Sequence, residues 1–353
     1  MNKTRISIFV VALLVVAAML AFVFKRNAAP QPDGQMPELT VGIAPYQDLA
    51  MLVNAPSLGF DAKSGIRLRL VTMAWEDILP AVASAGRTVD VGFGSYVEYL
   101  TKYARMNEGS SDPVIYVQPL YVYKGGGFIA LNSEIKPFTG AELNQPAAMA
   151  RLRGYRIGAQ KQSLYDMMIY SVAQRAGILP AELKVVDMPM NDGLLALQSG
   201  SLDITAGGLT QVSEARKRGG GLILSMEDAG FADITGFICL RSVLEKKRPQ
   251  IEALIRVWFQ SVDYVYGDMK TRSTESLAYL RKNAATKYTY EEYVEALSQE
   301  YLPRSLTELH DQMLAPGSRF DFVRIGKSIN GYLVANKIVA TPALIPTPLL
   351  ERD

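Results

Sequence analysis

The stretch from Arg153 to Ser225 constrains the fold most, because strand-like and helix-like segments alternate along it. A strand pattern ending at Ala159-Gln160 is followed by an amphipathic helix pattern, and Leu183–Met188 is a second short strand. A further helix and strand end at the small residues Gly207-Gly208. This order predicts an α/β fold with a parallel sheet, in which ligands bind at the carboxyl ends of the strands.

The segment before it repeats this alternation. The apolar run Leu39–Ala44 ends at Pro45, which predicts a buried strand with a sharp stop. Further strands are expected at 66–72 and 89–93, and helices at 48–58, 78–85 and 96–105.

Two segments of the chain share the same sequence pattern. Ala83 to Ser95 and Leu197 to Gly208 each end a helix at glycine, start a strand at an acidic residue and end it with small residues. Such a weak internal repeat predicts two similar α/β lobes.

The rest of the chain divides into a strand-rich part and a helical part. Residues 112–130 are expected to form strands. From Ile234 onward the spacing is mainly helical; for example, Ile251, Leu254 and Trp258 share one helix face. Helices are expected at 249–266, 274–283, 290–297 and 320–336.

The N-terminal segment is expected to lie outside the fold. An unbroken apolar run, Ile6–Phe24, stands between Lys3 and the pair Lys25-Arg26, and a polar linker follows it to Pro37. The run is close to the roughly 20 residues that span a bilayer. Residues 1–37 are therefore expected to be either a cleaved signal peptide or a membrane anchor with a linker, and either alternative places the body outside the cytoplasm.

Composition excludes several classes of protein. The formal net charge of +2 gives no reason to expect nucleic-acid binding. Cys239 is the only cysteine, so it forms no internal disulfide, and its apolar surroundings predict a buried strand residue. His310, the only histidine, lies in a surface-helix pattern, which argues against a histidine metal cluster or a Ser-His triad. We expect no catalytic residue, no metal and no cofactor.

Three motifs carry a resemblance to a known family: Gly154-Tyr-Arg-Ile-Gly158, Ala176-Gly-Ile-Leu-Pro180 and Gly200-Ser-Leu-Asp-Ile204. With the order of elements from Leu39 to Asn336, they resemble the nitrate, sulfonate, taurine and thiamine-precursor family of solute-binding proteins that serve ABC importers. The resemblance implies a two-lobed periplasmic-binding-protein fold of type II, each lobe a sheet flanked by helices. Lobe 1 would comprise 38–126 and 234–353, and lobe 2 would comprise 127–233.

The same resemblance implies a hinge that the chain crosses twice. The first crossing would fall near Tyr123–Phe128 and the second near Ile234–Phe237. Gly125, Gly126, Gly127 and Gly236 are the glycines that would let the backbone adopt hinge angles.

The candidate binding residues of lobe 1 follow its three expected strands. Tyr46 and Gln47 follow the first strand, Trp75 follows the second, and Gly94 and Ser95 follow the third. Aromatic side chains at these places can stack on a small solute. Ser95 can also cap the next helix and present its hydroxyl and a main-chain N–H together.

In lobe 2, the family places its substrate against the turn that contains Gln160, Ser163 and Tyr165. Ser163 with Asp166 matches a capping box, which predicts a helix start there. Thr210 and Gln211 follow the last strand of the lobe and complete the candidate list.

The ligand chemistry of the family is not transferred to this chain. Relatives often carry a Trp-Glu-Pro-like sequence where this chain has Gly208-Leu-Thr, and Lys161 is the one obvious cation near the expected cleft. Specific oxyanion sites usually use arginine or a web of N–H groups. A neutral, aromatic or zwitterionic solute is therefore an alternative to an oxyanion.

The resemblance implies a monomeric, non-enzymatic, extracytoplasmic component of an ABC importer that delivers a small solute to an inner-membrane permease. Two alternatives stay open. One is a solute sensor or adaptor anchored to the membrane by residues 6–24. The other is an enzyme similar to the synthases of the thiamine pyrimidine, which use cysteines and a histidine that this chain does not place in the expected cleft.

Overall fold

The computed structural model describes residues 36–84, 88–284 and 287–352. The apolar run at Ile6–Phe24 lies outside these ranges. Within them, no helix combines the length and apolar character that a membrane span requires. The chain divides into two units, Met1–Pro37 and Glu38–Asp353, and the fold described here is that of the second.

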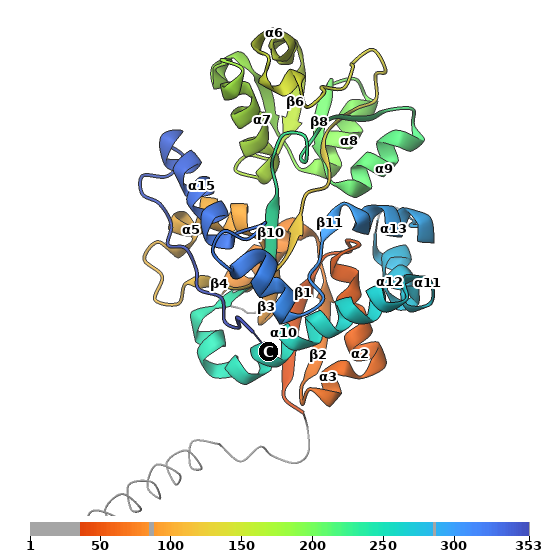
Figure 1. The fold of residues 1–353 in the computed structure, drawn as a ribbon, viewed down its shortest axis with the longest axis vertical. Helices are drawn as coiled ribbons and strands as arrows, with labels where there is room; N and C mark the ends of the chain where they lie inside the picture. The colour runs from red at the N-terminus through yellow and green to blue at the C-terminus, as the bar shows by residue number, and fades with distance from the viewer. Residues whose placement is uncertain (1–35, 85–87, 285–286, 353) are drawn as a thin grey trace, which may run out of the picture. The chain divides into compact units, whose positions relative to one another are not determined.

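The first sheet has the strand order β11-β4-β10-β3-β1-β2 in the described residues (Figure 1). β1 pairs in parallel with β2 and β3, and β10 runs antiparallel between β3 and β4. Its strands are β1 (Glu38–Ile43), β2 (Arg67–Thr72), β3 (Val91–Ser95), β4 (Val114–Tyr123), β10 (Asp233–Leu240) and β11 (Glu300–Tyr301).

The second sheet has the order β7-β6-β8-β5-β9 in the described residues. β6 pairs in parallel with β7 and β8, and β5 runs antiparallel between β8 and β9. The run β2-β1-β3-β10 of the first sheet thus has the same sense as β7-β6-β8-β5 of the second. Its strands are β5 (Gly127–Ala130), β6 (Arg156–Ala159), β7 (Lys184–Asp187), β8 (Ile204–Gly207) and β9 (Gly221–Ser225).

Helices flank both sheets (Figure 1). Helix α10 continues across a non-helical residue, Lys247, and Pro249 opens its second part, where a missing N–H costs nothing. The α-helices are α2 (Asn54–Leu58), α3 (Phe60–Lys63), α4 (Trp75–Ala83), α5 (Tyr96–Asn107), α6 (Pro146–Met149), α7 (Leu164–Arg175), α8 (Met190–Gln198), α9 (Leu209–Lys217), α10 (Arg241–Gly267), α11 (Met269–Arg272), α12 (Thr274–Asn283), α13 (Tyr290–Ser298), α14 (Leu306–Leu309) and α15 (Phe322–Ala335). Shorter helices of other types are η1 (Leu49–Val53), η2 (Glu142–Asn144), η3 (Ala150–Gly154), η4 (Pro180–Glu182) and η5 (His310–Leu314).

The chain crosses between the sheets twice, from β4 to β5 and from β9 to β10 (Figure 1). Two helix-flanked sheets joined by two crossings confirm the predicted fold class. The second crossing occupies 226–232, just before the expected place. The lobe boundaries, 38–126 and 234–353 against 127–233, stay a prediction.

Glycine is required at the first crossing, whereas Gly236 lies within a paired strand, and its role as a hinge residue stays a prediction. Gly126 and Gly127 have φ of 75° and 148°, which side chains rarely adopt. Gly236 lies inside β10, paired with both β3 and β4. A Cβ there would overlap the Gln118 carbonyl and the Tyr116 ring, so this glycine serves close packing.

The core of the first lobe lies between its sheet and α10. Trp258 of α10 is fully buried and its ring meets Phe93 edge-on at 5.4 Å between centroids. It stacks on Tyr121 of β4 at 5.9 Å. Cys239 is fully buried in β10, as its apolar surroundings predict, and burial raises the pKa of its thiol to about 12.

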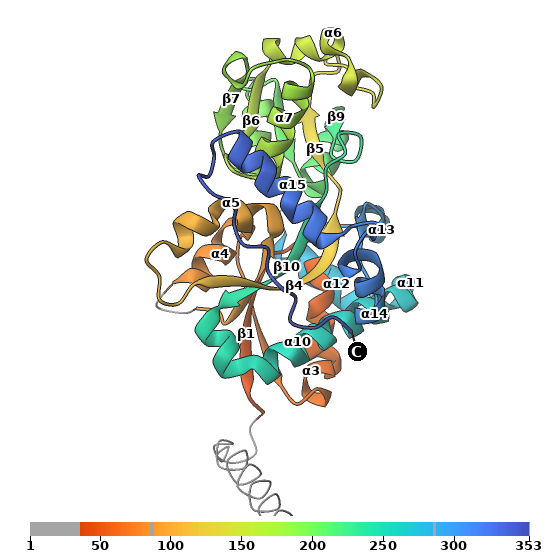
Figure 2. The same cartoon turned by 60° about the vertical axis from the view of Figure 1, so that its left-hand side comes forward.

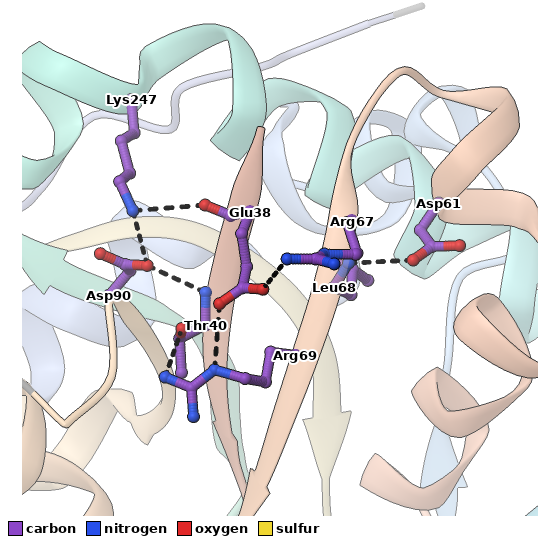
Figure 3. Close-up of polar contacts among 8 residues, drawn as sticks. All are labelled: Glu38, Thr40, Asp61, Arg67, Leu68, Arg69, Asp90 and Lys247. Carbon is purple, nitrogen blue, oxygen red and sulfur yellow. Dashed lines mark hydrogen bonds and ion pairs between the residues drawn. The ribbon is translucent and has the colours of Figure 1, made fainter. Parts of the chain in front are cut away.

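A polar cluster joins the starts of β1 and β2 to α10 (Figure 3). The Glu38 carboxylate accepts hydrogen bonds from Arg67 at 2.6 Å and from Arg69 at 3.1 Å. Lys247 reaches the Glu38 carbonyl at 3.3 Å and the Asp90 carboxylate at 2.8 Å. The cluster holds the amino ends of the parallel strands in register and leaves their carboxyl ends to face the site.

The C-terminal part returns to the first sheet. α15 lies beside α5 (Figure 2), where Phe322 stacks on Tyr96 at 4.3 Å. Beyond α15, the main chain of Leu350 exchanges two hydrogen bonds, of 2.9 and 2.8 Å, with the buried amide of Gln118. These contacts satisfy a polar side chain that would otherwise be buried in β4 without partners.

Candidate ligand-binding site

One cavity is lined by residues of both lobes. The centre of a water molecule can occupy about 100 Å³ of this cavity, and a single bound water requires only ~10–15 Å³. The space therefore suits a small organic molecule. Its lining is formed by Tyr46, Gln47, Asp48, Trp75, Ser95, Glu98, Tyr121, Tyr123, Gln160, Ser163, Leu164, Tyr165, Met190, Gly208, Leu209, Thr210, Gln211, Asp233 and Thr235.

The structure brings nine of the ten candidate residues together, and all ten lie in the described ranges. Gly94 is the exception, because it lines a smaller neighbouring cavity with Trp75 and Ser95. A role for these residues in binding stays a prediction. The nine that line the main cavity are Tyr46, Gln47, Trp75, Ser95, Gln160, Ser163, Tyr165, Thr210 and Gln211.

Two aromatic side chains form one wall. Tyr46 follows β1 through a turn in which its N–H bonds to the Ala44 carbonyl at 2.8 Å. Trp75 opens α4, and its ring centroid lies 6.1 Å from that of Tyr46. Burial, with the nearby charge of Glu76, raises the pKa of Tyr46, so its hydroxyl remains a neutral donor.

Ser95 and Asp233 meet at the start of α5. The Ser95 hydroxyl oxygen accepts from the Glu98 N–H at 3.1 Å, as an N-cap does. Asp233, from β10, accepts from the N–H groups of Val97 at 3.2 Å and Ile234 at 2.8 Å. This carboxylate is therefore occupied by the protein's own donors.

The corresponding turn of the second sheet begins α7. Ser163 caps the helix by accepting from the Asp166 N–H at 3.3 Å. Asp166 accepts instead from Gln162, one residue before the cap, at 2.9 Å. The expected helix start is present, with the carboxylate bonded one residue earlier than in a capping box. Gln162 has a positive φ of 60° at this turn.

Direct hydrogen bonds link the two sides of the cavity. The hydroxyls of Tyr123 and Tyr165 lie 3.1 Å apart. On the other side, the Thr210 and Tyr288 hydroxyls lie 2.6 Å apart, and Tyr288 donates to Gln47 at 3.3 Å. The described conformation therefore has the two lobes in polar contact around the cavity.

Gln211 is engaged within its own lobe. Its side-chain oxygen accepts from the Gly208 N–H at 3.0 Å, and its amide nitrogen donates to Asn191 at 2.9 Å. These bonds fix the first turn of α9 and hold Thr210 at the wall. Gln211 therefore positions the wall through its bonds to the protein.

The charged lining is acidic. None of the described residues that form it is lysine or arginine, whereas Asp48, Glu98 and Asp233 are carboxylic acids. Lys161, the cation expected near the cleft, does not line the cavity, and its main-chain N–H bonds to Asp187 at 2.8 Å. Glu98 pairs with Lys102 at 3.3 Å on α5.

Sequence reasoning missed the lining residues on the crossing strands. Tyr121 and Tyr123 alternate along β4 toward its end, and Asp233 and Thr235 alternate along the start of β10. The period-two pattern just before and after a crossing is the signal that could have found them. Asp48 was taken for a helix start, but it caps no N–H of η1.

Asp233 predicts a pH-dependent stability. Burial raises its pKa from 3.8 to about 7, against the hydrogen bond from Ser95; Glu98 raises it further. The folded state binds the proton of the Asp233 carboxyl more tightly than the unfolded state does. Protonation of Asp233 therefore stabilises the fold fully below pH ~4, and this stabilisation is lost as the pH rises to ~7. The unfolding free energy of the wild type, minus that of Asp233→Asn, should fall across this window by at most about 1.4 kcal/mol per pH unit.

Urea unfolding of both proteins between pH 4 and 8 measures this difference. Other titrating groups are common to both proteins and largely cancel; those nearest Asp233 are Glu98 on α5, Tyr116 on β4 and Tyr165 on α7. Parallel curves for the two proteins would show that Asp233 titrates normally in the fold.

None of the described residues that line the cavity is a cysteine or a histidine. Cys239 is buried in β10, and His310 contacts Asp311 at 3.0 Å. Within the described ranges, no group of three or more Cys, His, Asp or Glu side chains is placed to hold a metal ion.

Two helix-flanked sheets, crossed twice by the chain and enclosing a cavity at their strand ends, define a two-lobed protein of the periplasmic-binding-protein fold. The model of the NMT1-like family matches residues 33–279, and the chain belongs to that family. A search among curated proteins finds no match.

Solved structures share the fold at low sequence identity. The periplasmic aliphatic sulphonate binding protein SsuA from Escherichia coli is 15% identical, with a TM-score of 0.61 over 88% of this chain and 96% of that one. The periplasmic nitrate-binding protein NrtA from Synechocystis PCC 6803 is 16% identical, with a TM-score of 0.55 over 73% and 69%. The desulfurization enzyme DSZB is 14% identical, with a TM-score of 0.56 over 88% and 95%.

Proposed function

We propose that the protein is the extracytoplasmic solute-binding component of an ABC importer, which captures a small organic molecule and delivers it to a membrane permease. The observation that carries this proposal is the cavity lined by residues of both lobes. A solute that contacts both lobes stabilises their closed arrangement, and the permease recognises that state. Residues 6–24 would export the protein or tether it to the membrane.

Native mass spectrometry of the full-length protein, isolated from its own host under mild conditions, tests the proposal. We expect a bound small molecule at one per chain, because the cavity lies within one chain. A host that lacks the protein should take up that molecule more slowly. Protein that carries no small molecule and binds none of the host's extracted metabolites would contradict solute capture.

A sensor or adaptor with the same fold would also bind the solute. Uptake separates the two functions, since loss of a sensor leaves transport intact when the importer is supplied constitutively. An enzyme, the other alternative, would convert the molecule. The similar fold of DSZB shows that this scaffold can support catalysis, and recovery of the unchanged solute after long incubation argues for binding alone.

The aromatic wall provides a prediction for affinity. Tyr46→Ala or Trp75→Ala removes an aromatic surface from the cavity and should weaken solute binding by about 1–3 kcal/mol. Isothermal titration calorimetry with the host solute measures the change. Tyr264→Ala is the matched control, because Tyr264 packs on Phe60 away from the cavity and should leave affinity unchanged. Equal affinities for all three variants would remove the wall from the site.

A further inference from the structure

Asp48 is a buried carboxylic acid among the residues that line the cavity, and one of its two oxygens has no hydrogen-bond partner. The residue is 4% exposed and lines the cavity. Its Oδ2 accepts a hydrogen bond from the Tyr121 hydroxyl, while Oδ1 has no hydrogen-bond partner. A buried acceptor left without a donor is unfavourable, so this oxygen requires an explanation.

A second buried acid lies in the same electrostatic environment. Glu300 of β11 is 7% exposed; its Oε1 accepts from Gln47 at 2.7 Å and its Oε2 has no partner. Burial and the charge of Asp48 raise the pKa of Glu300 well above its usual value. Among the described residues, no lysine or arginine side chain forms an ion pair with either acid or contributes to its pKa shift.

Aromatic rings stand around the same part of the cavity. Tyr46 and Trp75 form one wall and Tyr121 holds Asp48. The faces of such rings carry negative potential and attract cations. Acid and aromatic groups thus favour the same kind of partner.

Building on the solute-binding function proposed above, we propose that the solute carries a protonated amine or another organic ammonium group, which is seated against Asp48 beside the aromatic wall. An ammonium supplies the N–H donors that the free carboxylate oxygen lacks, in a charge-assisted hydrogen bond. The rest of the solute extends toward the second lobe, where Gln160 and Thr210 offer neutral polar groups.

Other charges fit this wall less well. An oxyanion would face Asp48, with no lysine or arginine in the described lining to offset the repulsion. A divalent metal ion takes six or more oxygen ligands when it is calcium, and octahedral geometry when it is magnesium. The described residues provide no cluster of three acidic or nitrogen ligands there.

Three probes that share a 2-phenylethyl group and differ in charge test the proposal: 2-phenylethylamine, 2-phenylethanol and 3-phenylpropionate. Calorimetry with the full-length protein should show binding of the amine at least about tenfold tighter than of the other two. Equal or tighter binding of the alcohol or the acid would overturn the proposal. If none of the three binds, the solute found by native mass spectrometry decides, and a neutral or anionic solute overturns it.

Substitution of the acidic residues tests whether Asp48 recognises the charge of the ligand. Asp48→Asn should weaken binding of the cationic ligand about tenfold or more and remove the preference for the amine over the alcohol. Glu252→Gln is the matched control, because Glu252 pairs with Arg248 on α10 and does not line the cavity. Its effect should stay within about threefold.

If Asp48→Asn does not fold, Asp48→Ser, which also removes the carboxylate, provides the second variant and should weaken cation binding in the same direction. Unchanged discrimination in the folded variant would overturn the proposal. The outcomes also separate the two proposals: a bound neutral or anionic solute refutes the charge assignment alone. Absence of any bound solute refutes solute capture itself.

Discussion

Replacing Trp258 by alanine is expected to lower the free energy of unfolding by about 3–5 kcal/mol, the usual cost of removing a large buried aromatic side chain. The indole is fully buried and contacts Phe93, Phe237 and Tyr121 through ring faces and edges. The surrounding strands are paired on both sides, so they cannot move in to fill the cavity. Equilibrium unfolding in urea measures the change.

Trp258→Phe is the matched control. The indole Nε1–H is buried without a hydrogen-bond partner, so removing it costs no hydrogen bond. The phenyl ring keeps most of the aromatic contacts, and the loss should be about 1–2 kcal/mol. Equal losses for the two variants would show that the N–H has a partner, or that the core adapts in a way this packing does not predict.

Trp258→Ala should also weaken solute binding. Trp258 stacks on Tyr121, whose hydroxyl holds Asp48 at the cavity wall. Trp258→Ala therefore removes the support behind the acid as well as core volume. Solute affinity should fall in Trp258→Ala under conditions where the variant is still folded, and should be nearly retained in Trp258→Phe.

The parallel part of each sheet was predictable from sequence. The apolar run of β1 and the acidic residue directly before each of β3 and β8, Asp90 and Asp203, are local signals. Small residues at the ends of those strands place the next helix starts. This explains why Ser95 and Thr210 could be predicted to lie near each other, whereas Ser163 was predicted from the family resemblance; all three line the cavity.

The lining residues on the antiparallel strands β4 and β10 could not be predicted from the sequence. Which strands flank β10 depends on pairing between residues more than one hundred positions apart, and no local pattern states that pairing. Tyr121 and Asp233 therefore gave no sign that they share a cavity with Trp75. The sequence also carried no sign that Gly236 packs against β4, because close approach of a strand and a hinge both favour glycine.

Asp48 shows how a local rule can be overridden. An acidic residue just before a helical pattern is normally a cap. Here the helix begins as the 3-10 segment η1, the carboxylate makes no capping bond, and Tyr121 takes one of its oxygens. The tertiary partner, 73 positions away, decided the role of this side chain.

Gly127→Ala is the substitution at the hinge from which we expect the largest loss, about 2–4 kcal/mol of unfolding free energy. Gly127 begins β5 with φ of 148°, a conformation that costs any residue with a Cβ. A Cβ would also overlap the carbonyl oxygen of Leu224 on β9, which is main chain and cannot rotate away. Strain and overlap therefore add at this position.

Gly59→Ala separates the two contributions. Gly59 also has a positive φ, of 70°, but a Cβ there meets no atom within 4 Å, so only strain of about 1 kcal/mol is expected. Urea unfolding of both full-length variants gives the comparison. A loss at Gly127 no larger than that at Gly59 would mean that β9 can shift to admit a methyl group. The first crossing would then tolerate far more movement than the close β5–β9 contact implies.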